Sequence, residues 1–492
     1  MMSQSGLKFI EPLIFEKSVK GKTGYSLSKT NASGINLEDI FDPKYIRDEI
    51  EDFPELSENE VVRHFTRLSQ WNYGVDSGIY PLGSCTMKYN PKVNEEIARF
   101  RGFTNIHPYF PDSYIQGALE VLWNLQESLK EITGFKGVSL QPSAGAHSEF
   151  TGLKIMKAYL DSKGSKRDTI LIPDTAHGTN PASAILAGFK VKNVKSSEDG
   201  YLTLELLQDV FDDSIAGIMI TNPNTIGIYE HELEEIISFL HKHGALVYAD
   251  GANMNALMGK VRPGDLGVDV MHLNLHKTFS TPHGGGGPGS GPILVSEELV
   301  QFLPVPVIKK DENSFKIKTN MPKTIGRVKS FMGNFLVNIR AYAYILEMGE
   351  KGLTQATEDA VLSANYIRSS LTPYYHLPYK TDSLHEVVFS DEKFHNLGVK
   401  TLDVAKRLID YGIHPPTVYF PLIVSGAIMI EPTESESKES LDYLIDSMIK
   451  ISKEIKNREI GKLVEAPKIT VRGRLDEVRA AKRPILRWLP KK

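Results

Sequence analysis

Short apolar runs alternate with segments of helical character between residues 137 and 275. The runs are GVSLQ (137–141), DTILIP (168–173), GFKVKNV (188–194), GIMITN (217–222), ALVYAD (245–250) and VMHLNL (270–275). Parallel strands need long crossover connections, usually helices, so this alternation is typical of a parallel sheet. Runs that are apolar throughout belong to strands covered on both faces. The chain is therefore predicted to be an α/β protein with a mostly parallel, doubly wound sheet.

Three regions are predicted around this sheet. Residues 1–112 form an N-terminal arm with a turn-rich loop; within it, residues 43–51 are predicted to be helix-like and residues 58–70 an amphipathic helix. Residues 113–335 form the large domain, which opens with a helix over 113–132 that ends at Gly134. Residues 336–492 form a smaller C-terminal α/β domain with a basic tail. In the large domain's first helix the apolar positions are Ile115, Leu119, Leu122, Leu125 and Leu129.

Composition excludes several classes of function. The net charge of −4 favours neither nucleic acid nor a membrane surface as a partner. Cys85 is the single cysteine, so neither an intrachain disulfide nor a cysteine-based zinc site is expected. No apolar run approaches the roughly 18 residues of a spanning helix. The first residues do not read as a cleavable leader, and a cytoplasmic location is expected.

A single lysine follows the last apolar run. In NLHKTFSTPHGGGGPGSGP (274–292), Lys277 lies between that run and four glycines, 284–287. Open α/β sheets bind ligands at the carboxyl ends of their strands. Burial favours the uncharged amine of a lysine, which makes Lys277 a candidate for Schiff-base chemistry. A salt-bridged lysine beside a flexible loop is the alternative interpretation.

A small-residue turn follows the first apolar run. Ser143, Ala144, Gly145 and Ala146 precede a helical stretch that continues to residue 159. Backbone N–H groups at a helix N-terminus bind anions, and the helix dipole adds to the attraction. These four residues are therefore candidates to hold a phosphate. His147 follows directly; it is a candidate to stack on a ring, with a core histidine as the alternative.

An aspartate ends the run ALVYAD. A carboxylate at the end of a buried strand is costly unless a cation or a ring nitrogen needs it, although Asp250 also fits a helix cap. A phosphate turn, an aspartate and a lysine, in that order, match the layout of a pyridoxal-phosphate enzyme. In that layout the aldehyde forms an aldimine with Lys277 and Asp250 keeps the pyridine nitrogen protonated. The turn holds the phosphate, and His147 stacks on the ring.

Eight segments carry a resemblance to a known family. The sequence resembles the glycine decarboxylase P-protein of the glycine cleavage system, and within it the carboxy-terminal, cofactor-bearing subunit of the two-subunit form. The segments are YPLGSCTMKYNP (80–91), LQPSAGAHSEF (140–150), AHGTNPASA (176–184), TNPNTIGIYE (221–230), ADGANMNA (249–256), NLHKTFSTPHGGGGPG (274–289), IGRVKSFMGNF (325–335) and MIEPTESES (429–437).

The resemblance implies the type I pyridoxal-phosphate-dependent transferase fold, with Lys277 as the aldimine lysine. It supports Asp250 and His147 in the roles given above. It also suggests further contacts to the cofactor. Asn222 and Thr221 are candidates for its phenolic oxygen, while the candidates for its phosphate are His276, Thr278, Thr179 and His177.

The implied activity is that of a glycine dehydrogenase (aminomethyl-transferring, decarboxylating), an oxidoreductase. Glycine loses carbon dioxide, and its aminomethyl group passes to the lipoyl arm of the H-protein. No metal is expected, because the pyridine ring accepts the electrons. Fused members of the family carry a second, cofactor-free half, so the resemblance implies a separate subunit 1 and a heterotetramer with two copies of each subunit.

Two other functions stay open at this point. One is a different pyridoxal-phosphate enzyme, such as an aminotransferase or a decarboxylase of a larger amino acid. The other is a non-catalytic assembly subunit, against which the intact Lys277 and Asp250 argue.

The turn-rich loop at 80–89 is predicted to line the active-site entrance. Cys85 and Lys88 are then expected near the path of the lipoyl arm, with Lys88 as a cation that favours the thiolate.

Overall fold

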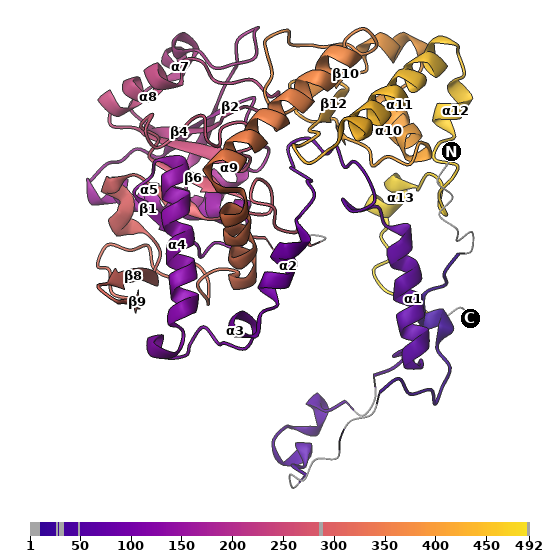
Figure 1. Ribbon diagram of the computed structural model, residues 1–492, viewed down its shortest axis with the longest axis horizontal. Helices are drawn as coiled ribbons and strands as arrows, with labels where there is room; N and C mark the ends of the chain where they lie inside the picture. The colour runs from indigo at the N-terminus through magenta and orange to yellow at the C-terminus, as the bar shows by residue number, and fades with distance from the viewer. Residues whose placement is uncertain (1–9, 26–27, 29–33, 48–49, 285–288, 490–492) are drawn as a thin grey trace.

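The structure, a computed structural model, describes residues 10–25, 28, 34–47, 50–284 and 289–489 (Figure 1). Three of the four consecutive glycines noted above, 285–287, lie outside these ranges, while Gly284 is described with a φ of +63°. No helix in the described ranges combines the length and the apolar character that a bilayer crossing requires.

In the described part of the chain, seven strands form one large sheet in the order β1-β7-β6-β5-β4-β2-β3. Strands β2 to β6 run parallel, and β7 is antiparallel to both β6 and β1. The prediction of a mostly parallel sheet is confirmed. The strands are β1 (Gly137–Ser139), β2 (Thr169–Pro173), β3 (Lys190–Val194), β4 (Ile215–Thr221), β5 (Leu246–Gly251), β6 (Val270–Leu273) and β7 (Ile293–Val295).

Both faces of this sheet are covered. Along β2, Leu171 joins the hydrophobic cluster of one face, whereas Ile170 and Ile172 join the cluster of the other, because successive strand side chains point to opposite faces. The first cluster contains α4, α7, α8 and part of α9, and the second contains α5 and α6. The helices are α4 (Gln116–Thr133), α5 (Gly145–Ser162), α6 (Asn180–Ala187), α7 (Leu204–Val210), α8 (Leu233–Lys242) and α9 (Phe335–Leu371). The sheet is therefore doubly wound, as predicted.

A smaller antiparallel sheet follows in the order β10-β12-β11, and a third hydrophobic cluster packs it against α10, α11 and the end of α9. Figure 1 shows α9 running from the large sheet toward this part. The elements are β10 (Val387–Ser390), α10 (Thr401–Asp410), β11 (Thr417–Val418), β12 (Ala427–Ile430), α11 (Lys438–Lys456), α12 (Ile460–Val464) and α13 (Glu477–Lys482). A separate hairpin joins β8 (Val307–Asp311) to β9 (Ser314–Lys318).

Helix α9 is shared between the two parts. Tyr344, in its first half, belongs to the cluster of the large sheet, and Ile367, in its second half, belongs to the C-terminal cluster. The helix is interrupted at Gly349, whose φ of +59° is outside the helical region. The division of the chain at residues 335 and 336 stays a prediction.

Helix α1 (Glu58–Trp71) and the described residues before it extend away from the large sheet in Figure 1. The next two helices, α2 (Lys92–Ala98) and α3 (Arg101–Thr104), lie beside the main body, where α2 packs against α9. The helix-like expectation for residues 43–51 is wrong in the described residues, which form only a 3-10 turn at Pro43–Tyr45. Tyr45 and Ile50 are exposed there, so no apolar face is buried to stabilise so short a helix.

The loop at 80–89 attaches to the small sheet. Leu82 forms an antiparallel bridge with Ile430, and the Gly83 N–H donates to the carbonyl oxygen of Met429. A Cβ at Gly83 would lie 2.3 Å from the Met429 side chain, so only glycine permits this close approach. This contact holds the loop against β12, close to the candidate active-site residue Lys277.

Candidate active site

Lys277 lies in the turn that follows β6. Its side chain is buried, with 7% of the residue exposed, and its Nζ donates to the carbonyl oxygen of Ser84 at 2.7 Å. Asp250 lies near the end of β5, the parallel neighbour of β6, and pairs in register with His272. Because the carboxyl ends of parallel strands share one edge of the sheet, the folded chain brings the lysine and the aspartate together at the edge where such folds bind ligands.

Asp250 is surrounded by donors. The Nδ1 of His177 lies 2.8 Å from its Oδ2, the Nδ2 of Asn180 donates to the same oxygen at 2.9 Å, and the Nε2 of His272 lies 3.4 Å from its Oδ1. Burial alone would raise the pKa of Asp250, but the two histidines and these hydrogen bonds hold it well below its usual range. The carboxylate is thus ionised although it is buried, which suits it to hold a protonated ring nitrogen.

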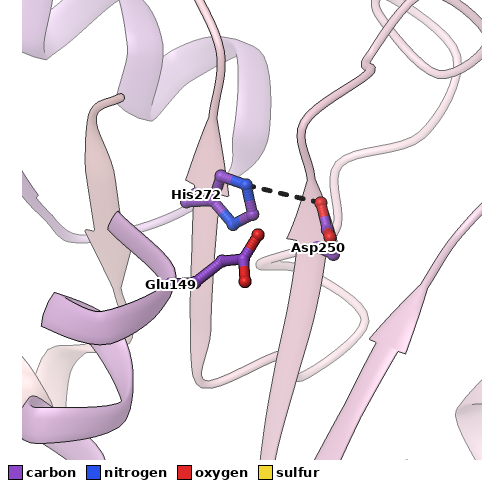
Figure 2. A group of neighbouring side chains, drawn as sticks. All are labelled: Glu149, Asp250 and His272. Atoms are coloured by element: carbon purple, nitrogen blue, oxygen red, sulfur yellow. Dashed lines mark ion pairs between the residues drawn. The ribbon is translucent and has the colours of Figure 1, made fainter. Parts of the chain in front are cut away.

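Glu149 and Tyr248 lie close to the pair of Asp250 and His272. Figure 2 shows Glu149 and His272 beside Asp250, with the ion pair between His272 and Asp250 marked. The Tyr248 hydroxyl lies 2.8 Å from the other ring nitrogen of His272, Nδ1. Glu149 accepts hydrogen bonds from the hydroxyls of Thr179 and Ser183, both at 2.7 Å. The hydroxyl of Thr179, a candidate for the phosphate, is therefore engaged with Glu149.

The predicted phosphate turn lies at the N-terminus of α5. The helix begins at Gly145, so the first N–H groups of α5 have no partner within the helix. A Cβ at Gly145 would lie 2.6 Å from Oδ1 of Asn274, and a Cβ at Gly291 would lie 2.5 Å from the carbonyl oxygen of Ala144. These close approaches pack the turn against the strand end that carries Lys277.

His147 lies in the first turn of α5. Its Nδ1 accepts a hydrogen bond from the Ser143 N–H at 3.2 Å, so this amide of the turn is occupied by the histidine. Burial, together with the nearby ammonium of Lys329, lowers the pKa of His147. A neutral ring held by a backbone amide suits stacking on a flat ligand.

The four remaining candidates are buried or largely buried, and backbone donors position them. The Thr278 hydroxyl accepts from the Met254 N–H at 2.9 Å, and the Thr221 hydroxyl accepts from the His177 N–H at 3.2 Å. Oδ1 of Asn222 accepts from the Glu230 N–H at 3.1 Å.

His276 is held by a backbone amide as well, since its Nδ1 accepts from the Ser290 N–H at 3.4 Å. Burial, with the His283 ring and the Lys277 ammonium nearby, lowers the pKa of His276 to about 3. Its ring is therefore a neutral group at physiological pH.

These residues fit pyridoxal phosphate by the chemistry of their donors. Lys277 offers an amine, Asp250 an ionised acceptor for a ring N–H, and the start of α5 a set of backbone amides. Oδ1 of Asn274, beside Gly145, is buried without a hydrogen-bond partner among the described residues.

Two glutamates at the site were not singled out from the sequence. Glu431 follows β12 and accepts from the Thr86 hydroxyl at 2.5 Å and from Nδ2 of Asn253 at 2.9 Å. Glu386 precedes β10 and accepts from the Ser84 N–H at 2.9 Å. Both are fully or almost fully buried. A signal was available in the runs HEVVF and IMIEP, where an acid adjoins an apolar strand and is costly unless it is used.

Lys88 is not the free cation expected beside Cys85. Its ammonium is buried and lies 2.5 Å from Oε1 of Glu434, while it also donates to the carbonyl oxygen of Thr278 at 2.6 Å. Burial raises the pKa of the Cys85 thiol, and the cation that opposes this shift is Lys277. The half-buried Sγ lies 3.7 Å from Nδ1 of His283, whose ring packs edge-on against the ring of His276. That the loop lines the active-site entrance stays a prediction.

Comparison with known proteins identifies relatives over nearly the whole chain. A family model described as "Glycine cleavage system P-protein" matches residues 31–321, and one described as "Glycine dehydrogenase, C-terminal domain" matches residues 356–472. A protein of Listeria monocytogenes serovar 1/2a named "Probable glycine dehydrogenase (decarboxylating) subunit 2" is 56% identical over 97% of this chain and 98% of its own length. A protein of Staphylococcus haemolyticus with the same name is 54% identical over 97% of each chain.

Solved structures agree on the fold. An inhibitor-bound crystal structure of glycine decarboxylase, the P-protein of the glycine cleavage system, superimposes with a TM-score of 0.72 at 19% identity. It covers 86% of this chain and 100% of that one. The cysteine desulfurase CsdA from Escherichia coli superimposes with a TM-score of 0.60 at 15% identity, covering 80% and 98%. At these identities the likeness establishes the fold alone.

Proposed function

Because this chain belongs to the family of glycine cleavage system P-proteins, we infer that it is subunit 2 of a glycine dehydrogenase (decarboxylating). Its fold is the type I fold of pyridoxal-phosphate-dependent enzymes, with the mostly parallel sheet described above. Two observations together carry this function. The chain is more than 50% identical to the subunit 2 relatives over nearly its whole length, and a buried lysine after β6 lies at the same sheet edge as an ionised aspartate of the neighbouring strand β5.

The cofactor of this family is pyridoxal phosphate, which supplies an electron sink when it is bound. We propose that Lys277 bonds it covalently, because this buried amine lies at the ligand edge of the sheet. Asp250 would keep the ring nitrogen protonated, and His147 would stack on the ring. Ser143, Ala144, Gly145 and Ala146 would hold the phosphate with the start of α5. Supporting contacts would come from His276, Thr278, Thr179, Thr221 and Asn222.

The residues of this chain then have defined tasks. The carbonyl of Ser84 fixes the direction of the Lys277 amine, which holds or releases a proton at Nζ as glycine takes its place. The network of His177, Asn180 and His272 keeps the charge on Asp250 constant. A rigid pocket can hold the glycine carboxylate in the orientation in which carbon dioxide leaves, and orientation of this kind lowers the barrier.

We propose three partners. The substrate is glycine, the acceptor of the aminomethyl group is the lipoyl arm of an H-protein, and the assembly partner is a subunit 1. The name "subunit 2" of the relatives supports a two-subunit enzyme. We propose two copies of each subunit, and a cytoplasmic location, as the sequence predicts.

The deciding experiment is exchange of labelled bicarbonate into the carboxyl group of glycine. The chain is purified with its partner subunit and assayed with and without lipoylated H-protein. Exchange that requires the lipoyl carrier is expected. Transamination of glycine with a keto acid, or decarboxylation of a larger amino acid in place of exchange, would instead identify a different pyridoxal-phosphate enzyme.

A further inference from the structure

Two carboxylates face each other behind Lys277. Glu386 immediately precedes β10 and Glu431 immediately follows β12, and these strands pair antiparallel with Val387 opposite Ile430. The next pair along this register is Glu386 and Glu431. Their carboxylate oxygens and a ring nitrogen of His385 lie within 4.8 Å of one another. Their exposed fractions are 2% for Glu386 and 0% for Glu431, so the two groups form a buried pair, here called the Glu386–Glu431 pair.

The charges around this pair do not balance two carboxylates. In the described chain, the titratable groups that face it are Lys277, Glu434, His385 and the thiol of Cys85. The charge of Glu434 is taken up by Lys88, at 2.5 Å. Burial lowers the pKa of His385 to about 3, so this histidine is neutral at physiological pH. In the described chain, the one cation that faces the two buried acids is therefore Lys277, whose amine is also the group proposed to bond the cofactor.

Like charges this close in a dry environment cannot both persist, and one of the acids keeps its proton. Burial raises the pKa of Glu431 to about 7, and burial together with the Glu431 charge raises the pKa of Glu386 well above its usual range. Glu431 accepts from Thr86 and Asn253, which favour its anion. Among the described residues, Glu386 accepts only from the Ser84 amide. The proton therefore rests mainly on Glu386.

The backbone of Ser84 connects the Glu386–Glu431 pair to Lys277 by hydrogen bonds. Ser84 donates its N–H to Glu386 and accepts from Nζ of Lys277 with its carbonyl oxygen. In addition, Oε2 of Glu431 is buried and has no hydrogen-bond partner among the described residues. An unpaired oxygen of this kind is costly and is expected where a proton or a ligand atom is received.

We propose that the Glu386–Glu431 pair stores one proton at neutral pH and gives it to the sulfur that leaves the lipoyl disulfide. This inference rests on the proposed function. In the reaction the bond between the glycine Cα and its carboxylate breaks, and its electron pair forms the new C–S bond. The S–S bond breaks, and its electron pair leaves on the second sulfur, which takes up one proton. The disulfide is reduced by two electrons, the glycine carbon is oxidised, and one proton is consumed from the pair and replaced from solvent.

The stored proton is tested by infrared difference spectroscopy of the cofactor-loaded protein at neutral pH. The parent protein is expected to show the C=O stretching band of a protonated carboxylic acid, and Glu386→Gln and Glu431→Gln are each expected to remove it. Each single change removes the second carboxylate, so the remaining acid is no longer held protonated by a like charge beside it and ionises. Subtraction of parent and variant spectra cancels other buried acids. Glu439→Gln, at an exposed position, is the matched control and leaves the band in place.

The delivery of the proton is tested by bicarbonate exchange with lipoylated H-protein. Both glutamine variants are expected to bind cofactor and glycine normally but to lose exchange roughly a hundredfold, a typical value for a general acid. Glu431→Asp, which restores a carboxyl group, is expected to recover the band and part of the rate. A band that survives both glutamine changes overturns the shared proton, and normal exchange without the band overturns its delivery. A parent protein that shows the band but no exchange would refute the proposed function instead.

Discussion

The Nζ of Lys277 lies 2.7 Å from the carbonyl oxygen of Ser84, a residue 193 positions earlier in the chain. Ser84 has a φ of +65°, in the left-handed region that few residues other than glycine adopt. Backbone in such a conformation persists only where its surroundings hold it, and here both the N–H and the C=O of Ser84 bond to site residues. The loop at 80–89 thus contributes its backbone, rather than its side chains, to the position of the lysine.

Replacement of this lysine tests the covalent attachment. Lys277→Ala is expected to lose the visible absorption of bound cofactor and nearly all exchange, because the amine that would bond the cofactor is removed. Borohydride reduction followed by peptide mapping measures the attachment. Lys260→Ala, at an exposed position, is the control and retains both signals. Recovery of a reduced cofactor adduct at the same peptide in Lys277→Ala would show that the assignment is wrong.

The proposed role of Asp250 in decarboxylation can be tested separately from cofactor binding. Asp250→Ala is expected to retain bound cofactor, since the lysine and the phosphate contacts remain, but to lose most decarboxylation, because an unprotonated pyridine is a poor electron sink. The loss is expected to be about a hundredfold or more in the exchange rate. Exchange near the parent rate would refute the proposed partnership between Asp250 and the ring nitrogen.

Cys85 permits a test of the entrance. Cys85→Ser is expected to keep exchange within a small factor, because the lipoyl group brings its own sulfurs. A bulky thiol reagent on the parent protein is expected to block exchange, and to react faster as the pH rises, since burial raises the pKa of the Cys85 thiol and the thiolate is the reactive form. Because Cys85 is the single cysteine, Cys85→Ser treated with the reagent is the control. Complete modification without loss of exchange would place the loop away from the entrance.

The buried Glu230 is expected to make the free energy of unfolding depend on pH. Burial raises its pKa to about 7, although the Asn224 side chain and the Leu202 N–H both donate to it. Between its unfolded pKa, about 4.3, and about 7, the folded state binds more protons than the unfolded state. The contribution of Glu230 to the free energy of unfolding therefore falls as the pH rises, by up to about 1.4 kcal/mol per pH unit.

Thermal or denaturant unfolding of the parent and of Glu230→Gln across this range measures the effect. From acid to neutral pH, the free energy of unfolding of Glu230→Gln is expected to rise relative to that of the parent. Above neutral pH, the difference between the two proteins is expected to stay constant. The constant offset from altered hydrogen bonds does not bear on the prediction. Parallel curves for the two proteins over the whole range would contradict it.

Assembly gives a further prediction. The chain alone is expected to be weakly active or inactive, and to form a heterotetramer of two copies each when mixed with its subunit 1. Mass determination by light scattering, with and without the partner, measures this. A purified homodimer of this chain with full exchange activity would count against the two-subunit enzyme.

Local patterns in the sequence were sufficient to predict the sheet and to place Lys277 and Asp250 at one of its edges. The continuous apolar runs that form β2, β4 and β5 are local features of their own segments, and so is the small-residue turn that starts α5. The carboxyl ends of parallel strands meet at one edge, so placing Lys277 after β6 and Asp250 in β5 already implied that they share a site.

Only the tertiary structure decided which groups surround these two residues. Ser84, Glu386 and Glu431 come from three distant segments, and each meets Lys277 only after the loop at 80–89 has paired with β12. The burial of Glu431 and the pairing of Lys88 with Glu434 likewise depend on contacts between residues hundreds of positions apart. A strand or helix pattern reflects the backbone period of its own segment. The charge state of a buried acid reflects instead the water it has lost and the charges nearby, which the packing of remote segments determines.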